Sequence, residues 1–140
     1  MRGPLTLKVR LILEDDGKIL LLKQTNKQGG KYTLLGGWVE KGETPLEAII
    51  RESKEEAGIE LLPVDLELVH TLHKQKSRER RITLYFRATH FEGRARSMEP
   101  HKFREVDWFK WRKLPDKLSP TTEHVLLQYR SGSKYSEYSL

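Results

Sequence analysis

The stretch from Thr44 to Gly58 constrains the fold most strongly, because it carries the start and stop signals of a helix. Thr44 is suited to cap the N-terminus, Pro45 fits the first helical position, and Glu47 completes a capping box with Thr44. Gly58 stands where helices commonly end in a left-handed residue. We therefore expect a helix over residues 45–57, against which the rest of the chain packs.

Apolar and alternating runs on both sides of this helix predict strands. Residues 7–13 and 18–22 flank turn-forming residues and predict a β-hairpin. A short strand over 32–35 is expected to end at the glycine pair 36–37. Further expected elements are strands at 66–73, 81–90 and 106–109, and a second helix from Ser119 to about 129. Strands on both sides of a well-capped helix indicate an α+β fold, a mixed β-sheet with helices packed on its faces.

The 140 residues fit a single domain, which we place at residues 1–130, with the Ser-rich residues 131–140 expected to form a flexible tail. The chain has no cysteine, so any metal site must use mainly oxygen ligands. The net charge of +6 favours anionic partners. No apolar run is long enough to cross a membrane and no secretory leader is recognisable, so a cytoplasmic location is expected.

Three glutamates share one stripe of the predicted helix. Glu52, Glu55 and Glu56 are spaced at i, i+3 and i+4, which puts their side chains within one arc. Like charges at this spacing repel, and the helical wheel turns Arg51 away from the stripe. A glutamate-rich face of a helix is often simply exposed to solvent and binds no ligand. A hard divalent cation that also accepts phosphate oxygens is the alternative that would neutralise the stripe.

The sequence around the stripe favours that alternative. The residues follow the pattern Gly37, five residues, Glu43, seven residues, Arg51-Glu52, two residues, Glu55-Glu56, one residue and Gly58. This pattern matches the Nudix box at every fixed polar and glycine position. The chain therefore resembles the Nudix hydrolases, and within them the MutT-like nucleoside triphosphate pyrophosphohydrolases. Two departures, Ser53 in place of an aliphatic residue and Leu35 in place of a proline, affect packing and loop stiffness rather than the carboxylates.

The resemblance implies a Nudix fold, with a mixed sheet between helices, and a set of site residues. Carried over by position, the metal ligands are Glu52, Glu55, Glu56, the Gly37 carbonyl and Glu40. The implied ion is Mg²⁺, with Mn²⁺ able to substitute. Arg51 is expected to pair with Glu43. Candidates for the general base are Glu55 or Glu56, with Glu99 or Glu105 of a later loop as alternatives.

The reaction implied is attack of metal-activated water on phosphorus in a nucleoside diphosphate linked to a further group X. A (d)NTP, including oxidised guanine nucleotides, would give the monophosphate and pyrophosphate. Lys23, Trp38 and Trp108 are candidates for contacting this nucleotide, although aromatic residues in small domains are more often core. The basic run 74–81 is read as a solvated loop, so no stable nucleic-acid complex is expected. A homodimer is compatible with the family.

Three alternatives remain. A dinucleoside polyphosphate, nucleotide-sugar or capped-RNA hydrolase would share the same box. A non-catalytic nucleotide sensor would keep the fold without needing all three glutamates. An RNA-binding domain using the basic run would show salt-sensitive affinity that is independent of Mg²⁺.

Overall fold

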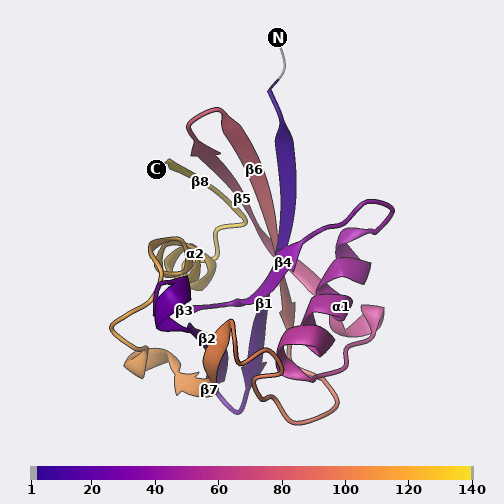
Figure 1. Cartoon of the computed structure of the whole chain (residues 1–140), viewed down its shortest axis with the longest axis vertical. Helices are drawn as coiled ribbons and strands as arrows, with labels where there is room; N and C mark the ends of the chain where they lie inside the picture. The colour runs from indigo at the N-terminus through magenta and orange to yellow at the C-terminus, as the bar shows by residue number, and fades with distance from the viewer. Residues whose placement is uncertain (1–2, 140) are drawn as a thin grey trace.

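The computed structural model describes residues 3–139, which fold into two α-helices, eight strands and three short 3₁₀ turns (Figure 1). The strands are β1 Leu5–Asp15, β2 Lys18–Gln24, β3 Tyr32–Thr33, β4 Leu35–Trp38, β5 Glu67–Lys76, β6 Glu79–Ala88, β7 Phe103–Lys110 and β8 Tyr135–Ser139. The helices are α1 Pro45–Ala57 and α2 Pro120–Arg130. The 3₁₀ turns are η1 Asn26–Gln28, η2 Pro63–Asp65 and η3 Trp111–Lys113.

The sheet is mixed, as the sequence predicts. Its strand order is β3-β2-β1-β6-β5-β8, with β4 paired to β1 and β7 paired to β2. β1 runs parallel to β6 and antiparallel to β4, and β5 runs parallel to β8. β1 therefore lies at the centre of the fold, where it meets three other strands.

Two tight turns set the register of the hairpins. Asp16 and Gly17 both have positive φ and join β1 to β2 across the pair Asp15 and Lys18, as expected of a two-residue hairpin loop. The turn between β5 and β6 includes Ser77, also at positive φ. The expected solvated loop over the basic run 74–81 is wrong in extent, because β5 continues to residue 76 and β6 begins at residue 79.

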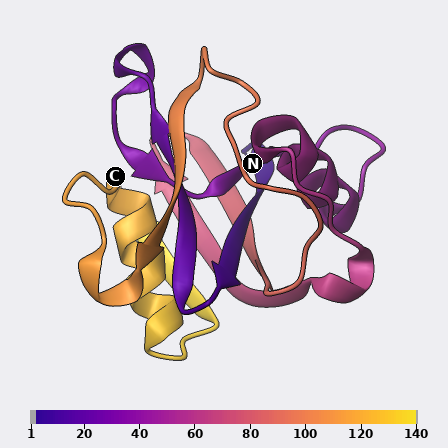
Figure 2. The same ribbon diagram turned by 90° about the horizontal axis from the view of Figure 1, so that it is seen from below.

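The two helices cover opposite faces of the sheet (Figures 1 and 2). Alternate residues of β1 point to opposite faces, so Leu11 packs with Ile49 of α1 while Ile12 packs with Val125 of α2. Each of these side chains is essentially fully buried. The fold is thus the sandwich of helix, sheet and helix that the sequence analysis predicts.

The segment 131–139 differs from the expected flexible tail. Residues Tyr135–Ser139 form β8, which pairs with the edge strand β5. Ser136 contributes to this pairing by contacting the buried His70, at 2.8 Å from its Nε2. Pairing with β5 and the contact between Ser136 and the buried His70 both hold this segment in place. Leu140 lies outside the described residues.

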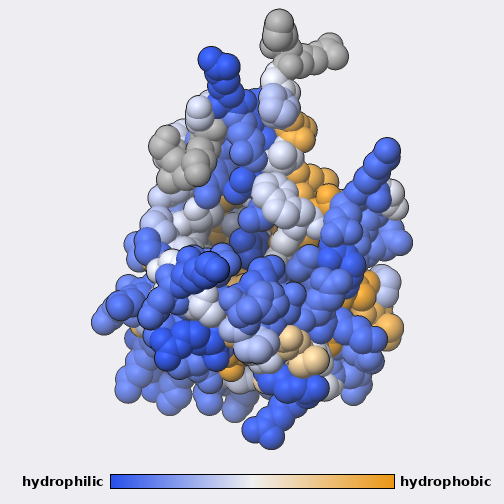
Figure 3. All heavy atoms as spheres, in the orientation of Figure 1, coloured by the Kyte–Doolittle hydropathy of each residue, from blue (hydrophilic) through white to orange (hydrophobic). Residues whose placement is uncertain are grey.

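The surface seen in Figure 3 is predominantly hydrophilic, with apolar side chains gathered in small areas. Within residues 3–139, neither helix has the length and apolar character that crossing a bilayer requires.

Candidate active site

Local signals position α1 as the sequence predicts. The Thr44 hydroxyl accepts a hydrogen bond from the Glu47 N–H, and the Glu47 carboxylate accepts one from the Thr44 N–H. Gly58 ends the helix with φ of 68°. Ser53 is fully buried and donates to the Ile49 carbonyl at 2.6 Å, so the helix itself satisfies this unexpected polar residue.

The buried face of α1 includes part of the acidic stripe. Leu46 is partly exposed, whereas Glu52 and Glu56 are buried together with Ser53. Glu55, on the same stripe, keeps about half of its side chain exposed (51%). Two of the three carboxylates therefore lie against the sheet, and one faces solvent.

Arg51 lies at the centre of the carboxylate cluster, by which we mean Glu43, Glu52, Glu55 and Glu56. This position corrects the expectation that Arg51 points away from the stripe. Its Nε donates to Glu43 at 2.7 Å, which is the pairing expected from the resemblance. Its Nη1 donates to Glu52 at 2.7 Å and to Glu55 at 3.1 Å. Its Nη2 donates to the Trp38 carbonyl at 3.1 Å. A helical wheel gives only the direction of the Cβ atom, whereas the long Arg51 side chain extends back across the acidic stripe.

Hydrogen bonds from Arg51 lower the pKa of Glu43 from its usual value. Burial has the opposite effect on Glu52 and raises its pKa, although Arg51 and Lys102 oppose the shift. Arg51 therefore favours the ionised form of Glu43, whereas burial disfavours the negative charge of the neighbouring Glu52.

Glu56 is the most buried member of the stripe, with 2% of its side chain exposed. It accepts a hydrogen bond from the Gly36 N–H at 3.0 Å, and Lys102 lies 3.8 Å from its other oxygen. Burial raises the pKa of Glu56 to about 7, an effect that the negative charge of Glu52 reinforces. A carboxyl group with this pKa can gain or lose a proton near neutral pH.

The glycine pair allows the helix carboxylates to approach the sheet. The pair lies within β4, so the expectation that the strand ends before it is wrong. A Cβ atom at Gly37 would lie 2.7 Å from the Glu52 carboxyl carbon, so only glycine leaves this space to the carboxylate. At Gly36, which has φ of 150°, a Cβ atom would overlap the Val9 carbonyl oxygen.

The donor set around this pair suits a hard divalent cation. It comprises Glu52, Glu55, Glu56 and the backbone of Gly37, all oxygen ligands. Among residues 3–139, no three such side chains already stand close enough to form a complete metal site. Arg51 instead supplies the positive charge to Glu52 and Glu55. The residues present fit such a cation chemically, provided that these two carboxylates turn from Arg51 toward it.

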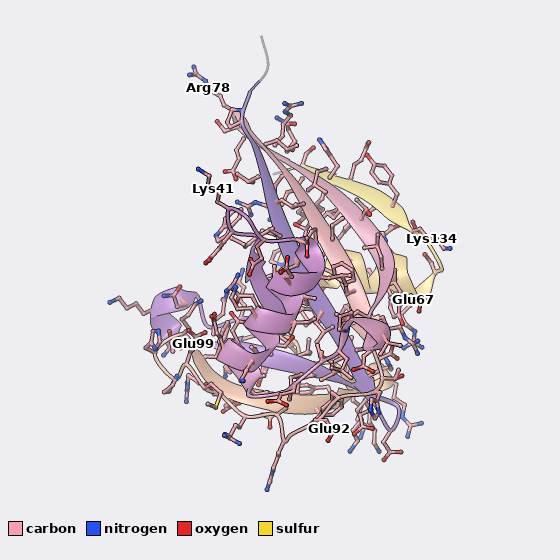
Figure 4. All side chains as sticks on the ribbon, turned by 90° about the vertical axis from the view of Figure 1, so that its right-hand side faces the viewer. Lys41, Glu67, Arg78, Glu92, Glu99 and Lys134 are labelled. Carbon is pink, nitrogen blue, oxygen red and sulfur yellow. The ribbon has the colours of Figure 1, made fainter. Side chains whose placement is uncertain are left out.

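The other residues predicted for the site are only partly brought together. Glu40 is exposed at the margin, 3.9 Å from Arg51. Glu99 lies on the loop beside the C-terminal half of α1 (Figure 4), 4.0 Å from Lys102. Glu105 instead accepts a hydrogen bond from Tyr32 on β3 at 3.4 Å, outside the carboxylate cluster.

The three candidate nucleotide contacts fall in three different places. Lys23 lies over the Tyr32 ring, away from the carboxylate cluster. Trp108 stacks on Phe91 and packs against the core. Trp38 alone lines a cleft that also includes Glu56.

Two cavities that share lining residues lie in this region. The cleft that contains Glu56 and Trp38, here called the carboxylate cleft, has a volume of about 170 Å³. It shares Lys8 and Arg10 with a second cavity of about 190 Å³, which we call the basic cleft because Lys8, Arg10, Lys74 and Arg81 line it. The interpretation of the run 74–81 as solvated is thus wrong for Lys74 and Arg81.

Sequence reasoning missed Lys8, Arg10 and Lys102 as site residues. The alternation Lys8-Val9-Arg10 in a predicted strand put both cations on one face, and this was the available signal. Only strand pairing shows that this face also carries Lys74 and Arg81.

Known proteins are similar to this chain over most of its length. The NUDIX domain family model matches residues 4–129. An ADP-ribose pyrophosphatase of Methanocaldococcus jannaschii is 34% identical over 119 residues, which cover 84% of this chain and 69% of that protein. The NAD-capped RNA hydrolase NudC of Photorhabdus laumondii subsp. laumondii is 32% identical over 100 residues, which cover 71% of this chain but only 37% of NudC.

Solved structures give the same fold. A MutT NUDIX hydrolase from Burkholderia pseudomallei superposes with a TM-score of 0.81 at 28% identity, covering 89% of this chain and 98% of the other. The E. coli ORF135 protein superposes with a TM-score of 0.76 at 26% identity, covering 92% and 90% of the two chains.

Proposed function

Since this chain belongs to the Nudix family and is a MutT-like hydrolase, we propose that it cleaves a nucleoside triphosphate into the nucleoside monophosphate and pyrophosphate. The observation that carries the proposal is the carboxylate cluster at the glycine pair. Glu52 and Glu56 are buried against Gly36 and Gly37, and Arg51 joins Glu43, Glu52 and Glu55. Nudix enzymes generally use a divalent metal, and we propose Mg²⁺ for this one.

We assign Glu52, Glu55, Glu56 and the Gly37 carbonyl as the metal-holding groups, with Glu40 at the margin. A divalent ion bound there would lower the pKa of water and neutralise phosphate charge. Arg51 is a positioning residue, because it touches the carboxylates rather than the reacting atoms.

Among the candidates for the general base, Glu55 is the one we assign. Its side chain is half exposed, so water can approach it, whereas Glu52 and Glu56 are buried. Glu105 is bound to Tyr32 outside the cluster, and this contact argues against it. Glu99 stands close to Lys102 and is the second choice.

Glutamine substitutions test the proposed chemistry. We expect Glu55→Gln and Glu56→Gln each to lower kcat by at least about 100-fold, because each removes a carboxylate used in the reaction. The Glu56→Gln side chain still accepts from Gly36, so its thermal unfolding should remain cooperative. The measurement is pyrophosphate release from a panel of (d)NTPs with Mg²⁺.

The control for these variants is Glu92→Gln, an exposed glutamate on the loop after β6 (Figure 4), which should retain full activity. If both helix variants retained full turnover, the assignment of the cluster to catalysis would be wrong. If the wild type released no product from any triphosphate but cleaved another diphosphate, only the substrate would need revision.

An ADP-ribose hydrolase is the second candidate, favoured by the relative of that name. Cleavage of ADP-ribose gives AMP and ribose 5-phosphate but no pyrophosphate. Product analysis with both substrates therefore separates the two activities.

A further inference from the structure

We propose that the basic cleft binds a phosphate group of the substrate that lies beyond the diphosphate held at the carboxylate cluster. This inference rests on the proposed function and narrows it. The favoured substrates are those with at least one phosphate more than the diphosphate, such as nucleoside triphosphates, rather than ADP-ribose.

Strand pairing places four cations on one face of the sheet. Lys8 and Arg10 are alternate residues of β1, and β1 pairs in parallel with β6, with Lys8 opposite Thr83. Arg81 lies two residues before Thr83 and opposite Lys74 of β5. All four cations line the same cavity, on the face that α2 covers.

No Asp or Glu is among the described residues that line this cavity. Outside the cavity lining, Glu79 accepts a hydrogen bond from Arg81 at 3.0 Å, and the charge of Glu56 acts on Lys8 from the carboxylate cleft. Burial, together with the charges of Arg10, Arg81 and Lys74, lowers the pKa of Lys8 to about 7. Bound negative charge would relieve this repulsion.

The polar groups of the cleft suit phosphate oxygens. The Nε of Arg81 is buried and has no hydrogen-bond partner among the residues that the structure describes. Lys74 is held by the Thr121 hydroxyl at 2.9 Å, at the N-terminal end of α2. Arginine N–H groups and the positive end of a helix dipole both favour phosphate.

A nucleobase is a poorer occupant of the same space. Trp38 already has Lys8 at 4.7 Å and Arg81 at 4.6 Å from its ring centroid. Tyr85 is 3% exposed and packs in the core beneath α2. Tyr85 therefore offers no free ring surface to a base, and Trp38, although 44% exposed, does not line the basic cleft.

The position of the cleft connects it to the reaction. Lys8 and Arg10 line both cavities, so one extended polyphosphate can contact the carboxylate cluster and the basic cleft together. A triphosphate would use both cavities, whereas the diphosphate of ADP-ribose would bring a neutral sugar to the cations.

Direct binding to the metal-free protein tests the inference without turnover. Inorganic tripolyphosphate is titrated calorimetrically in EDTA into the wild type and into the double variant Lys74→Gln/Arg81→Gln. We expect binding by the double variant to be at least tenfold weaker. The matched control, Lys113→Gln/Lys134→Gln, removes the same charge from exposed positions and should bind like the wild type.

A charge-conserving variant, Lys74→Arg/Arg81→Lys, guards against a folding defect and should recover most of the binding. Equal binding by the wild type and the folded glutamine variant would overturn the inference, as would equal loss in the matched control.

Kinetics with Mg²⁺ then test the substrate class. The ratio of kcat/KM for the preferred triphosphate to that for ADP-ribose should fall at least tenfold in Lys74→Gln/Arg81→Gln, mainly through KM. An unchanged ratio would contradict the inference even if both substrates are cleaved. If neither substrate is cleaved by the wild type, the proposed function fails, while tripolyphosphate binding still decides the role of the cleft.

Discussion

Arg51 connects groups that would otherwise repel one another. Its guanidinium donates to Glu43, Glu52 and Glu55, and its side chain is only 25% exposed. These contacts raise the already high pKa of Arg51 still further, chiefly through the hydrogen bonds to Glu43. In the metal-free protein this one cation therefore stabilises the arrangement of three carboxylates.

Replacing Arg51 should separate its effects on stability and on catalysis. We expect Arg51→Gln to lower the free energy of unfolding in EDTA by about 2 kcal/mol, because three carboxylates lose a shared charged donor. With saturating Mg²⁺ the loss should be smaller, since the ion supplies positive charge to the same groups. Urea denaturation with and without Mg²⁺ measures both values.

The exposed Arg112→Gln is the matched control and should have no effect on stability in either condition. An equal loss with and without Mg²⁺ would show that Arg51 and the metal do not act on the same carboxylates.

Spacing alone identified the three glutamates, because residues at i, i+3 and i+4 share a helical face. It could not give the reach of Arg51, whose terminal groups lie several bonds beyond Cβ. Nor could it show that Glu52 and Glu56 are buried, because their burial depends on the glycine pair of a distant strand.

At the level of elements, the two glycines of β4 have different roles, one beside the Glu52 carboxylate and one against the backbone of β1. We expect Gly37→Ala to weaken Mg²⁺ binding and activity at least tenfold with a small effect on stability, because its Cβ meets only the end of the Glu52 side chain. Gly36→Ala should instead cost more than about 2 kcal/mol of stability, because its Cβ meets backbone and φ is positive. Thermal unfolding and Mg²⁺ titration of both variants distinguish the two effects. Equal behaviour of the pair would contradict this division.

β8 is held by a polar contact that a local pattern cannot reveal. The consistent assignment has His70 Nδ1–H donating to the Ser133 carbonyl and the Ser136 hydroxyl donating to His70 Nε2, each at 2.8 Å. His124 Nε2 lies 2.9 Å from the same hydroxyl. The Ser-rich composition predicted fraying, whereas a partner 66 residues away in the chain orders the segment.

Removing this hydroxyl should destabilise the sheet edge. We expect Ser136→Ala to cost about 1–2 kcal/mol, because it leaves a buried imidazole nitrogen without a partner. Ser139→Ala, at an exposed position of the same strand, should be nearly neutral. Chemical denaturation gives the two costs, and similar values would show that the contact contributes nothing specific. Hydrogen exchange of β8 amides should rise only in the first variant.

For the whole molecule, two titratable groups with shifted pKa values, Glu56 and Lys8, give opposite dependences of stability on pH. The pKa of Glu56 is raised from 4.5 to about 7, so the folded protein binds the extra proton and loses stability as pH rises through this window. The pKa of Lys8 is lowered from 10.5 to about 7, so the unfolded chain binds the extra proton and stability increases as pH rises from 7. His124, with a lowered pKa, opposes the first trend over part of its range.

The free energy of unfolding of the metal-free protein should therefore be lowest near pH 7, with each arm on the order of 2 kcal/mol. Denaturation in EDTA at pH 5, 7 and 9.5 measures the curve. Glu56→Gln should flatten the acidic arm and Lys8→Met the alkaline arm, whereas Glu92→Gln and Lys134→Gln should change neither. A curve without a minimum, unaffected by the first two variants, would contradict the prediction.

Different elements build the two parts of the candidate site, which meet at Lys8 and Arg10. α1 packs on one face, the basic cleft opens on the other, and the glycine pair of β4 lies between them. Lys74, Arg81 and Thr121 consequently have no role in packing α1 and can be exchanged without disturbing its carboxylates. A gene library randomised at these three codons should yield enzymes with new substrate preferences and an unchanged metal requirement, so the architecture allows selectivity to evolve while the chemistry is conserved.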